Sequence, residues 1–159
     1  TGEIRRACEI SGVQYLRCLR EKMEAVPDEA DRVIWAQSVE DAVEYLQNTE
    51  GKILITTGSK ELEAFAGDPV LRERIFARVL PDSQVLKKCE DLGLHGAHII
   101  AMQGPFSVEL NYALLRTVQA GWLVTKEAGK RGGFAEKIEA ARQCGVSVVV
   151  IRRPDVFSV

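Results

Sequence analysis

Short apolar runs rich in β-branched residues alternate along this chain with segments whose apolar residues recur every three or four positions. The second pattern predicts amphipathic helices over residues 38–48, 83–92 and 133–144, with another helix beginning near Ser107. A shorter helix is expected up to Gly67, capped by Ser59. The apolar runs predict β-strands at residues 33–36, 52–57, 75–80, 122–126 and 147–152, and one more from Ile99.

The regular alternation of strand and helix predicts the fold class. The strands are continuous β-branched runs rather than in-and-out patterns, which is typical of strands buried on both sides. We therefore expect an α/β fold, a parallel sheet flanked by helices on both faces, Rossmann-like or flavodoxin-like. Right-handed crossovers then place the loops after the strands on one edge, where α/β proteins bind ligands. These loops are TTGS, LPDS, MQGPFS, TKEAGKRGG and the corner at residues 152–154.

The first part of the chain has a different character. Residues 1–12 predict a short charged helix, residues 13–19 a strand, and residues 22–31 a charged linker that contains Pro27. The chain starts at Thr1 without an initiator Met, which is expected of a processed chain or of a piece cut from a longer one.

Composition narrows the classes of function. The chain has 159 residues, 46% hydrophobic and 28% charged, with a net charge of −2, which suits one domain and gives no reason to expect nucleic acid or a membrane as partner. No apolar run approaches the ~20 residues of a membrane span. The cysteines are scattered and lack a CxxC pair or a nearby His cluster, so we expect no metal site, no disulfides and a reducing, cytoplasmic location. They are Cys8, Cys18, Cys89 and Cys144.

Three loops carry candidate chemistry, although none contains G-x-G-x-x-G or a P-loop motif. In the first, Gly104, Pro105 and Ser107 form a tight turn before a helix, which could present backbone donors or could be a plain connection. The TTGS loop could hold a phosphate on its amides, although Ser59 could equally be only a cap.

Cationic residues add to the third loop. Lys126 ends an apolar strand and is followed by a glycine-rich turn, and the other cations expected on this edge are Lys130, Arg131, Arg152 and Arg153. Cations above helix N-termini suit an anionic ligand. His95 and His98 are expected at the opposite edge, as structural or exposed residues.

Several of these segments together resemble one family. MQGPFSVELN, VTKEAGKRGG with Glu136 and Lys137, TTGSKELEAF and VVVIRRP resemble the precorrin-6A reductase family of cobalamin biosynthesis, in order and spacing, over most of residues 51–154. The resemblance implies reduction of one double bond of a corrin precursor, precorrin-6A or cobalt-precorrin-6A, with hydride from NADPH or NADH. It also implies an enzyme of two Rossmann-like halves with the site between them.

The resemblance covers the C-terminal half of such an enzyme. Residues 1–20 then look like the end of a missing N-terminal nucleotide-binding half, and residues 21–159 like the C-terminal α/β domain. The missing half is an expected partner, and this chain alone is expected to be inactive.

The residues and the resemblance together give the expected site. Lys126 is the expected catalytic residue, although it could instead pair with a substrate carboxylate or be a solvated strand end. Capping is the alternative for Ser107, loop satisfaction for Gln103 and solvent exposure for Asn111. Ala128 stands where the family leads us to expect Ser. The expected substrate-binding residues are Gln103, Gly104, Pro105, Phe106, Ser107, Asn111, Gly132 and Gly133, and the expected cofactor-binding residues are Thr57, Gly58 and Ser59.

Two other classes of function stay open on the sequence. One is a non-catalytic α/β module that binds a tetrapyrrole or nucleotide. The other is a flavodoxin-like signalling or interaction domain in which these loops are only connections.

Overall fold

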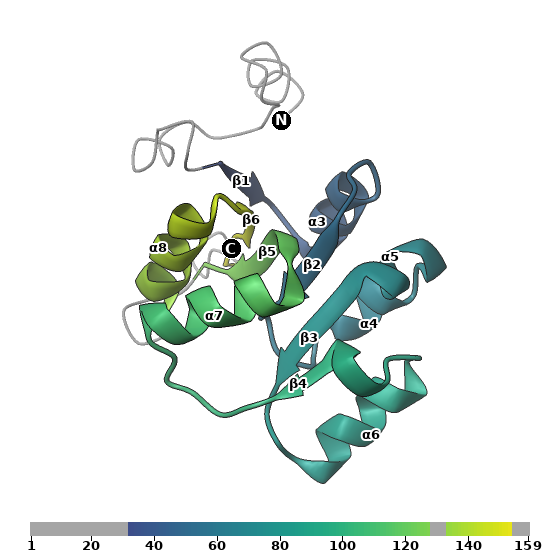
Figure 1. The fold of residues 1–159 in the computed structure, drawn as a ribbon. Helices are drawn as coiled ribbons and strands as arrows, with labels where there is room; N and C mark the ends of the chain where they lie inside the picture. Colours follow the sequence, from purple (N-terminus) through teal and green to yellow (C-terminus); the bar gives the residue numbers. More distant parts are fainter. Residues whose placement is uncertain (1–31, 128–132, 154–159) are drawn as a thin grey trace.

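The structure is a computed structural model that describes residues 32–127 and 133–153 (Figure 1). The helix, strand and linker predicted within residues 1–31 lie outside the described residues, as do Ala128, Lys130, Arg131 and Gly132. The strands are β1 (Val33–Ala36), β2 (Lys52–Ile55), β3 (Ile75–Val79), β4 (Ile99–Ala101), β5 (Ala120–Lys126) and β6 (Ser147–Ile151). The helices are α3 (Val39–Leu46), α4 (Leu62–Ala66), α5 (Pro69–Arg74), α6 (Ser83–Asp91), the short 3-10 helix η1 (Gly96–His98), α7 (Val108–Val118) and α8 (Phe134–Cys144).

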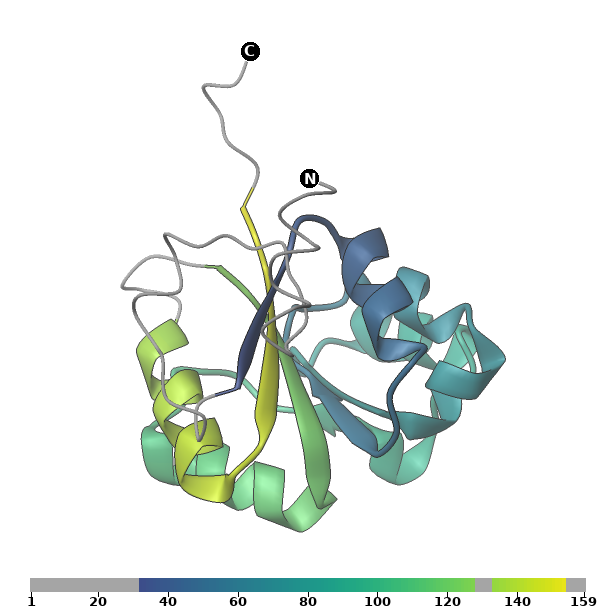
Figure 2. The same cartoon turned by 90° about the horizontal axis from the view of Figure 1, so that it is seen from above.

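The six strands form one sheet in the order β1-β6-β5-β2-β3-β4, and every neighbouring pair is parallel. Helices α7 and α8 cover one face, and α3, α4, α5 and α6 cover the other (Figures 1 and 2). The predicted α/β fold with helices on both faces is therefore confirmed.

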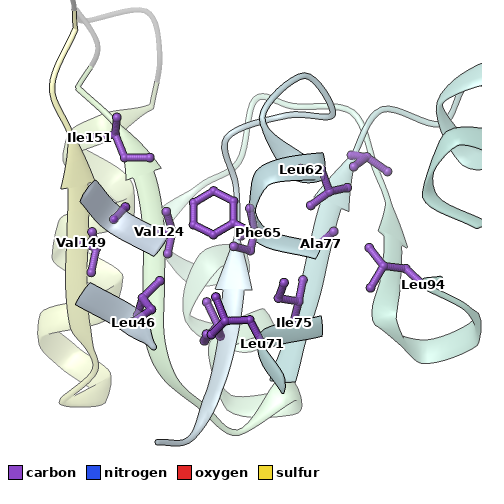
Figure 3. Close-up of a cluster of buried hydrophobic side chains, with 14 of the residues drawn as sticks. Leu46, Leu62, Phe65, Leu71, Ile75, Ala77, Leu94, Val124, Val149 and Ile151 are labelled. Atoms are coloured by element: carbon purple, nitrogen blue, oxygen red, sulfur yellow. The ribbon is translucent and has the colours of Figure 1, made fainter. Parts of the chain in front are cut away.

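Each face of the sheet has its own apolar core. Phe65 of α4 and Leu46 of α3 pack onto the inward side chains of the strands in the larger cluster, shown in Figure 3. Leu115 of α7 and Ala141 of α8 do the same on the other face. This burial on both sides explains why the strands read as continuous apolar runs.

Side chains at the helix starts set the loop geometry. The Ser38 and Ser107 hydroxyls accept hydrogen bonds from Asp41 N and Leu110 N, both at 3.0 Å, so these predicted starts are confirmed. The prediction that Ser59 caps α4 is wrong. That helix begins at Leu62, and its N-cap is Glu61, which makes no side-chain cap hydrogen bond.

The position of β5 beside β2 defines the part of the sheet edge where a ligand is expected. From β2 the chain passes through α4 and α5 to β3, while from β5 it passes through α8 on the other face to β6. The two connections leave in opposite directions, which makes the carboxyl ends of β5 and β2 the topological switch point, the usual ligand site of open α/β sheets.

Candidate functional site

The carboxyl edge of the sheet gathers the loops that the sequence placed there. Thr57 follows β2, the segment from Gln103 to Ser107 follows β4, and Lys126 ends β5. The opposite edge holds the histidines, as predicted. His98 Nδ1 lies 2.7 Å from the carbonyl oxygen of Ile75, the first residue of β3. A cavity of about 350 Å³ at that edge is lined by Arg72, Glu73, Gly93, His95 and His98.

Lys126 spans the switch point. Its Nζ lies 3.3 Å from Glu61 Oε2, with 45% of the Lys126 side chain and 21% of the Glu61 side chain exposed. Glu61 Oε1 is buried and has no hydrogen-bond partner among the described residues. The ammonium is therefore held at the end of β5 by a carboxylate that still has an unused acceptor.

The Thr57 to Ser59 loop was expected to contact the cofactor. Thr57 is 8% exposed, and its Oγ1 has no hydrogen-bond partner within the described part of the chain, so it can serve a ligand hydroxyl or amide. Gly58 takes a φ of +94°, which only glycine adopts easily. The carboxylate of Glu61 at the start of the following five-residue helix disfavours a phosphate here. The role of this loop in cofactor binding stays a prediction.

The loop before α7 presents its tip to solvent. Gln103, Gly104 and Pro105 are exposed, and Phe106 is half-buried. A Cβ at Gly104 would lie 3.0 Å from Cε2 of the Phe106 ring, so glycine is the residue that lets this ring pack where it does. The peptide between Gly104 and Pro105 is cis. The role of these residues in substrate binding stays a prediction.

Arg78 lies beneath this loop, and the sequence reasoning missed it. The residue is 6% exposed, its Nη1 donates to Asn111 Oδ1 at 2.8 Å, and its guanidinium carbon is 3.8 Å from the centre of the Phe106 ring. No carboxylate among the described residues forms an ion pair with it. Burial lowers the pKa of Arg78 to about 10, which leaves it charged at neutral pH.

Asn111 fixes both Arg78 and the loop. Its amide nitrogen donates to the Ser107 carbonyl at 2.8 Å and to the Phe106 carbonyl at 3.4 Å, while its oxygen accepts from Arg78. Only 2% of Asn111 is exposed, so the alternative of solvent exposure is wrong. Because the amide is engaged by the protein, the residue is suited to positioning Arg78 and the loop.

Lys137 is a second cation at this edge, and it is half-buried. Its Nζ donates to Thr125 Oγ1 at 3.0 Å, one residue before Lys126. Burial, together with the nearby charges of Arg78 and Lys126, lowers the pKa of Lys137 to about 8. In the sequence, Lys137 stood out only as part of the segments that resemble the precorrin-6A reductase family.

Strand register explains how these cations meet. Ile55 pairs with both Ala77 and Val124, so the next residues of β2, β3 and β5 lie at one level. Arg78 and Thr125 therefore flank β2 on the same face of the sheet, where Asn111 and Lys137 reach them from α7 and α8. A charged residue within the apolar run 75–80 was the available signal, since such charges in buried strands need a partner or a ligand.

The remaining rim residues are more dispersed. Gly133 is the N-cap of α8, with a φ of +72°. The Arg152 guanidinium lies 5.9 Å from the centre of the Trp35 ring, on the β6 and β1 side of the sheet. Arg153 is exposed, and its backbone nitrogen donates to Glu127 Oε1 at 3.1 Å. The predicted basic rim thus has its described cations in two groups, one at the switch point and one near β6.

Comparison with known proteins identifies the family. The model of the family described as Precorrin-6x reductase CbiJ/CobK matches residues 1–159. The chain belongs to this family. A cobalt-precorrin-6A reductase of Methanothermobacter thermautotrophicus is 41% identical over 155 residues, covering 95% of this chain and 49% of the relative. One from Priestia megaterium is 38% identical over 128 residues, covering 79% and 50%.

A solved structure of a CobK precorrin-6A reductase supports the fold. It superposes with a TM-score of 0.63 at 22% sequence identity, over 94% of this chain and 57% of that one. The chain therefore spans about half the length of the family relatives that it matches.

Two kinds of feature are absent from the described residues. Within residues 32–127 and 133–153, no group of three or more His, Cys, Asp or Glu residues could hold a metal ion. No helix in the same ranges is long and apolar enough to cross a membrane.

Proposed function

We propose that this chain forms the substrate side of a precorrin-6A or cobalt-precorrin-6A reductase of cobalamin biosynthesis. Its place is the C-terminal half of the enzyme, with an N-terminal nucleotide-binding half as partner. The corrin precursor lies over the carboxyl edge of the sheet, at the ends of β5 and β2. NADPH or NADH, when bound, supplies the hydride.

One observation carries this proposal, the cluster of Lys126, Lys137 and Arg78 at the switch point. The only carboxylate within ion-pair distance of any of them, among the described residues, is that of Glu61. A precorrin carries acetate and propionate carboxylates, which form charge-assisted hydrogen bonds with such cations. Together with family membership, the cluster favours an anionic tetrapyrrole over a neutral ligand.

Lys126 is the residue that we assign to proton delivery. Addition of hydride to a conjugated double bond leaves negative charge on the macrocycle, which a nearby ammonium can stabilise or quench by donating a proton. The end of a central strand fixes this ammonium more firmly than a mid-loop position would. The Glu61 carboxylate keeps the ammonium directed over the switch point.

The remaining loops bind and orient. Gln103 and Ser107, with the backbone of Gly104 to Phe106, contact the edge of the macrocycle, and Gly132 and Gly133 allow close approach of the lysine loop. Thr57 Oγ1, with Gly58 and Ser59, contacts the ribose or nicotinamide of the cofactor. The phosphates of the cofactor are bound by the partner half, because the negative charge of Glu61 disfavours them at the Thr57 to Ser59 loop.

A chimera tests the function. Residues 1–159 replace the matching segment of the Methanothermobacter relative, and the purified protein is assayed for loss of reduced nicotinamide absorbance with cobalt-precorrin-6A. Reduction that depends on both reactants is expected. The isolated chain, assayed alongside, should turn over little substrate, because hydride transfer needs both reactants held in near-attack geometry.

Two results would contradict the proposed function. A chimera that folds and binds both reactants without reducing the substrate would leave a non-catalytic binding module as the better description. Robust reduction by residues 1–159 alone would contradict the need for a second half.

A further inference from the structure

We propose that Arg78 and Lys137 form a partly buried subsite for one carboxylate of the ligand, on the α7 and α8 face of the sheet beneath the Gln103 to Ser107 loop. The proposal deepens the proposed function and rests on it only for the tetrapyrrole origin of that carboxylate. The subsite is distinct from Lys126, which lies above it at the strand end.

The first argument is uncompensated charge. Arg78 is 6% exposed, and Lys137 is half-buried with its ammonium on Thr125, yet neither makes an ion pair with a carboxylate in the described part of the chain. Burying one charge without a partner is costly, and two adjacent like charges add repulsion. A fold retains such a pair most readily where a ligand supplies the missing negative charge.

The second argument is that the guanidinium is already oriented. Asn111 holds one edge of it at 2.8 Å, and the Phe106 ring lies against its face at 3.8 Å. Among the described residues, Nη1 is the only guanidinium nitrogen that makes a hydrogen bond, so the other donors are available to a ligand. A flat, fixed fork matches a carboxylate without further ordering.

The third argument is convergence. Arg78 and Thr125 stand at the same level on either side of Thr56, two strand spacings of about 4.8 Å apart. Thr125 Oγ1 holds the Lys137 ammonium at this level. The two cations therefore lie on the same face of the sheet on either side of β2, close enough for the charge of Arg78 to lower the pKa of Lys137. Such a pair can offer hydrogen-bond donors to one carboxylate.

A nucleotide phosphate is also an anion that these two cations can bind. The position of the subsite favours a carboxylate of the tetrapyrrole instead. The subsite extends across β2, from Arg78 beneath the loop that follows β4 to Lys137 beside Thr125 on β5. A carboxylate arm reaching down from a macrocycle seated on the edge enters here, whereas a phosphate is held most readily by backbone amides. The test separates the two sources.

Removal of these cations should reveal a functional rather than a structural role. Arg78→Met removes a buried charge and Lys137→Met a half-buried one, and each leaves an apolar side chain of similar length. Without ligand, we expect Lys137→Met to unfold at the same or a higher urea concentration than the unaltered chain, and a lower midpoint would show that Lys137 serves the fold. Arg78→Met also leaves the buried Asn111 oxygen without its donor, so this variant is judged by ligand binding.

Binding is measured with residues 1–159 and a porphyrin that carries acetate and propionate side chains, by absorbance titration. We expect each variant to weaken porphyrin binding at least about tenfold, the usual cost of a lost charge-assisted hydrogen bond. Lys87→Met is the matched control, because it removes one exposed positive charge on α6 and should leave binding unchanged. NADPH and inorganic phosphate are titrated in parallel.

A second readout follows Lys137 directly. The pKa of its ammonium, measured by carbon NMR of labelled lysine, should rise when the porphyrin binds, since a nearby carboxylate favours the charged form. The same porphyrin as its methyl ester should leave that pKa unmoved.

The proposal is overturned if both variants bind the porphyrin as tightly as the unaltered chain, if the unaltered chain does not bind it, or if the Lys137 pKa stays constant. Selective loss of NADPH or phosphate binding would assign the subsite to a nucleotide and also overturn it. No turnover is needed, so an inactive chimera leaves these results intact.

Discussion

The ammonium of Lys126 lies 3.3 Å from the carboxylate of Glu61, and this contact joins the end of β5 to the start of α4 across the switch point. The two residues are 65 positions apart in the sequence. A ligand carboxylate that binds Lys126 must compete with Glu61, so the pair can tune how strongly this edge binds anions.

Glu61→Gln is expected to strengthen binding of the carboxylate porphyrin, because it frees Lys126 and removes a negative charge from the edge. The unfolding free energy should change by less than about 1 kcal/mol, since the pair is partly exposed. Absorbance titration and urea unfolding measure the two effects. Weaker porphyrin binding would show that Glu61 supports the site by orienting Lys126.

Lys126→Met and Lys126→Arg in the chimera separate proton delivery from carboxylate binding. Loss of a general acid should lower kcat by roughly 10² to 10⁴ with little change in substrate affinity, whereas loss of a carboxylate contact should chiefly raise KM. Single-turnover reduction gives the hydride step directly. If neither variant alters that step, Lys126 is a binding residue only.

The lowered pKa of Lys137 predicts that the stability of the fold depends on pH. Its folded pKa of about 8 lies below the ordinary 10.5, so between these values the unfolded chain binds more protons than the folded chain. The contribution of Lys137 to the free energy of unfolding therefore rises as pH increases from about 8 to 10.5, by on the order of 2 kcal/mol. The raised pKa values of Tyr45, Cys89 and Cys144 act in the opposite direction.

The comparison with Lys137→Met isolates this contribution, because the other three groups are unchanged in the variant. Urea unfolding at several pH values should show a difference in stability that favours the variant at pH 7 and shrinks toward pH 10. A constant difference across that range would contradict the assignment.

Gly104→Ala tests the packing that orients Arg78. The added Cβ would lie 3.0 Å from the Phe106 ring, so the ring must shift slightly and its packing against the guanidinium is disturbed. We expect porphyrin binding to weaken by a few-fold, since a cation–π contact of a half-buried ring is worth about 1 kcal/mol. Phe106→Leu should reproduce the effect. Unchanged porphyrin binding in both variants would show that the Phe106 ring does not orient Arg78 for the ligand.

The sequence was sufficient for the fold because its signals are local. The strand runs and the Ser38 and Ser107 caps each depend on neighbouring residues, and each appears where expected. Ser59 misled the prediction since a serine near a helix start is only one of several ways to begin it. Here α4 begins at Leu62 without a side-chain cap.

The site was harder to predict because it depends on register between distant strands. Lys126 and the loop at Gln103 were recognisable as strand ends. The meeting of Arg78 with Lys137 requires that β2 lie between β3 and β5 at one exact offset, together with the positions of α7 and α8. Periodicity along the chain carries no such information, so Arg78 read as one charge within a strand.

The short length of β4 affects how a wide ligand can enter. This strand has three residues, lies at the end of the sheet and pairs only with β3 in the described part of the chain. Beyond it, Met102 N still donates to the Val79 carbonyl at 2.9 Å, and the chain is tied down again at Phe106, whose carbonyl accepts from the Asn111 amide and whose ring lies on Arg78. Adjustment to a broad, flat molecule is therefore confined to the exposed turn at Gln103, Gly104 and Pro105, while β5 and β2 stay fixed.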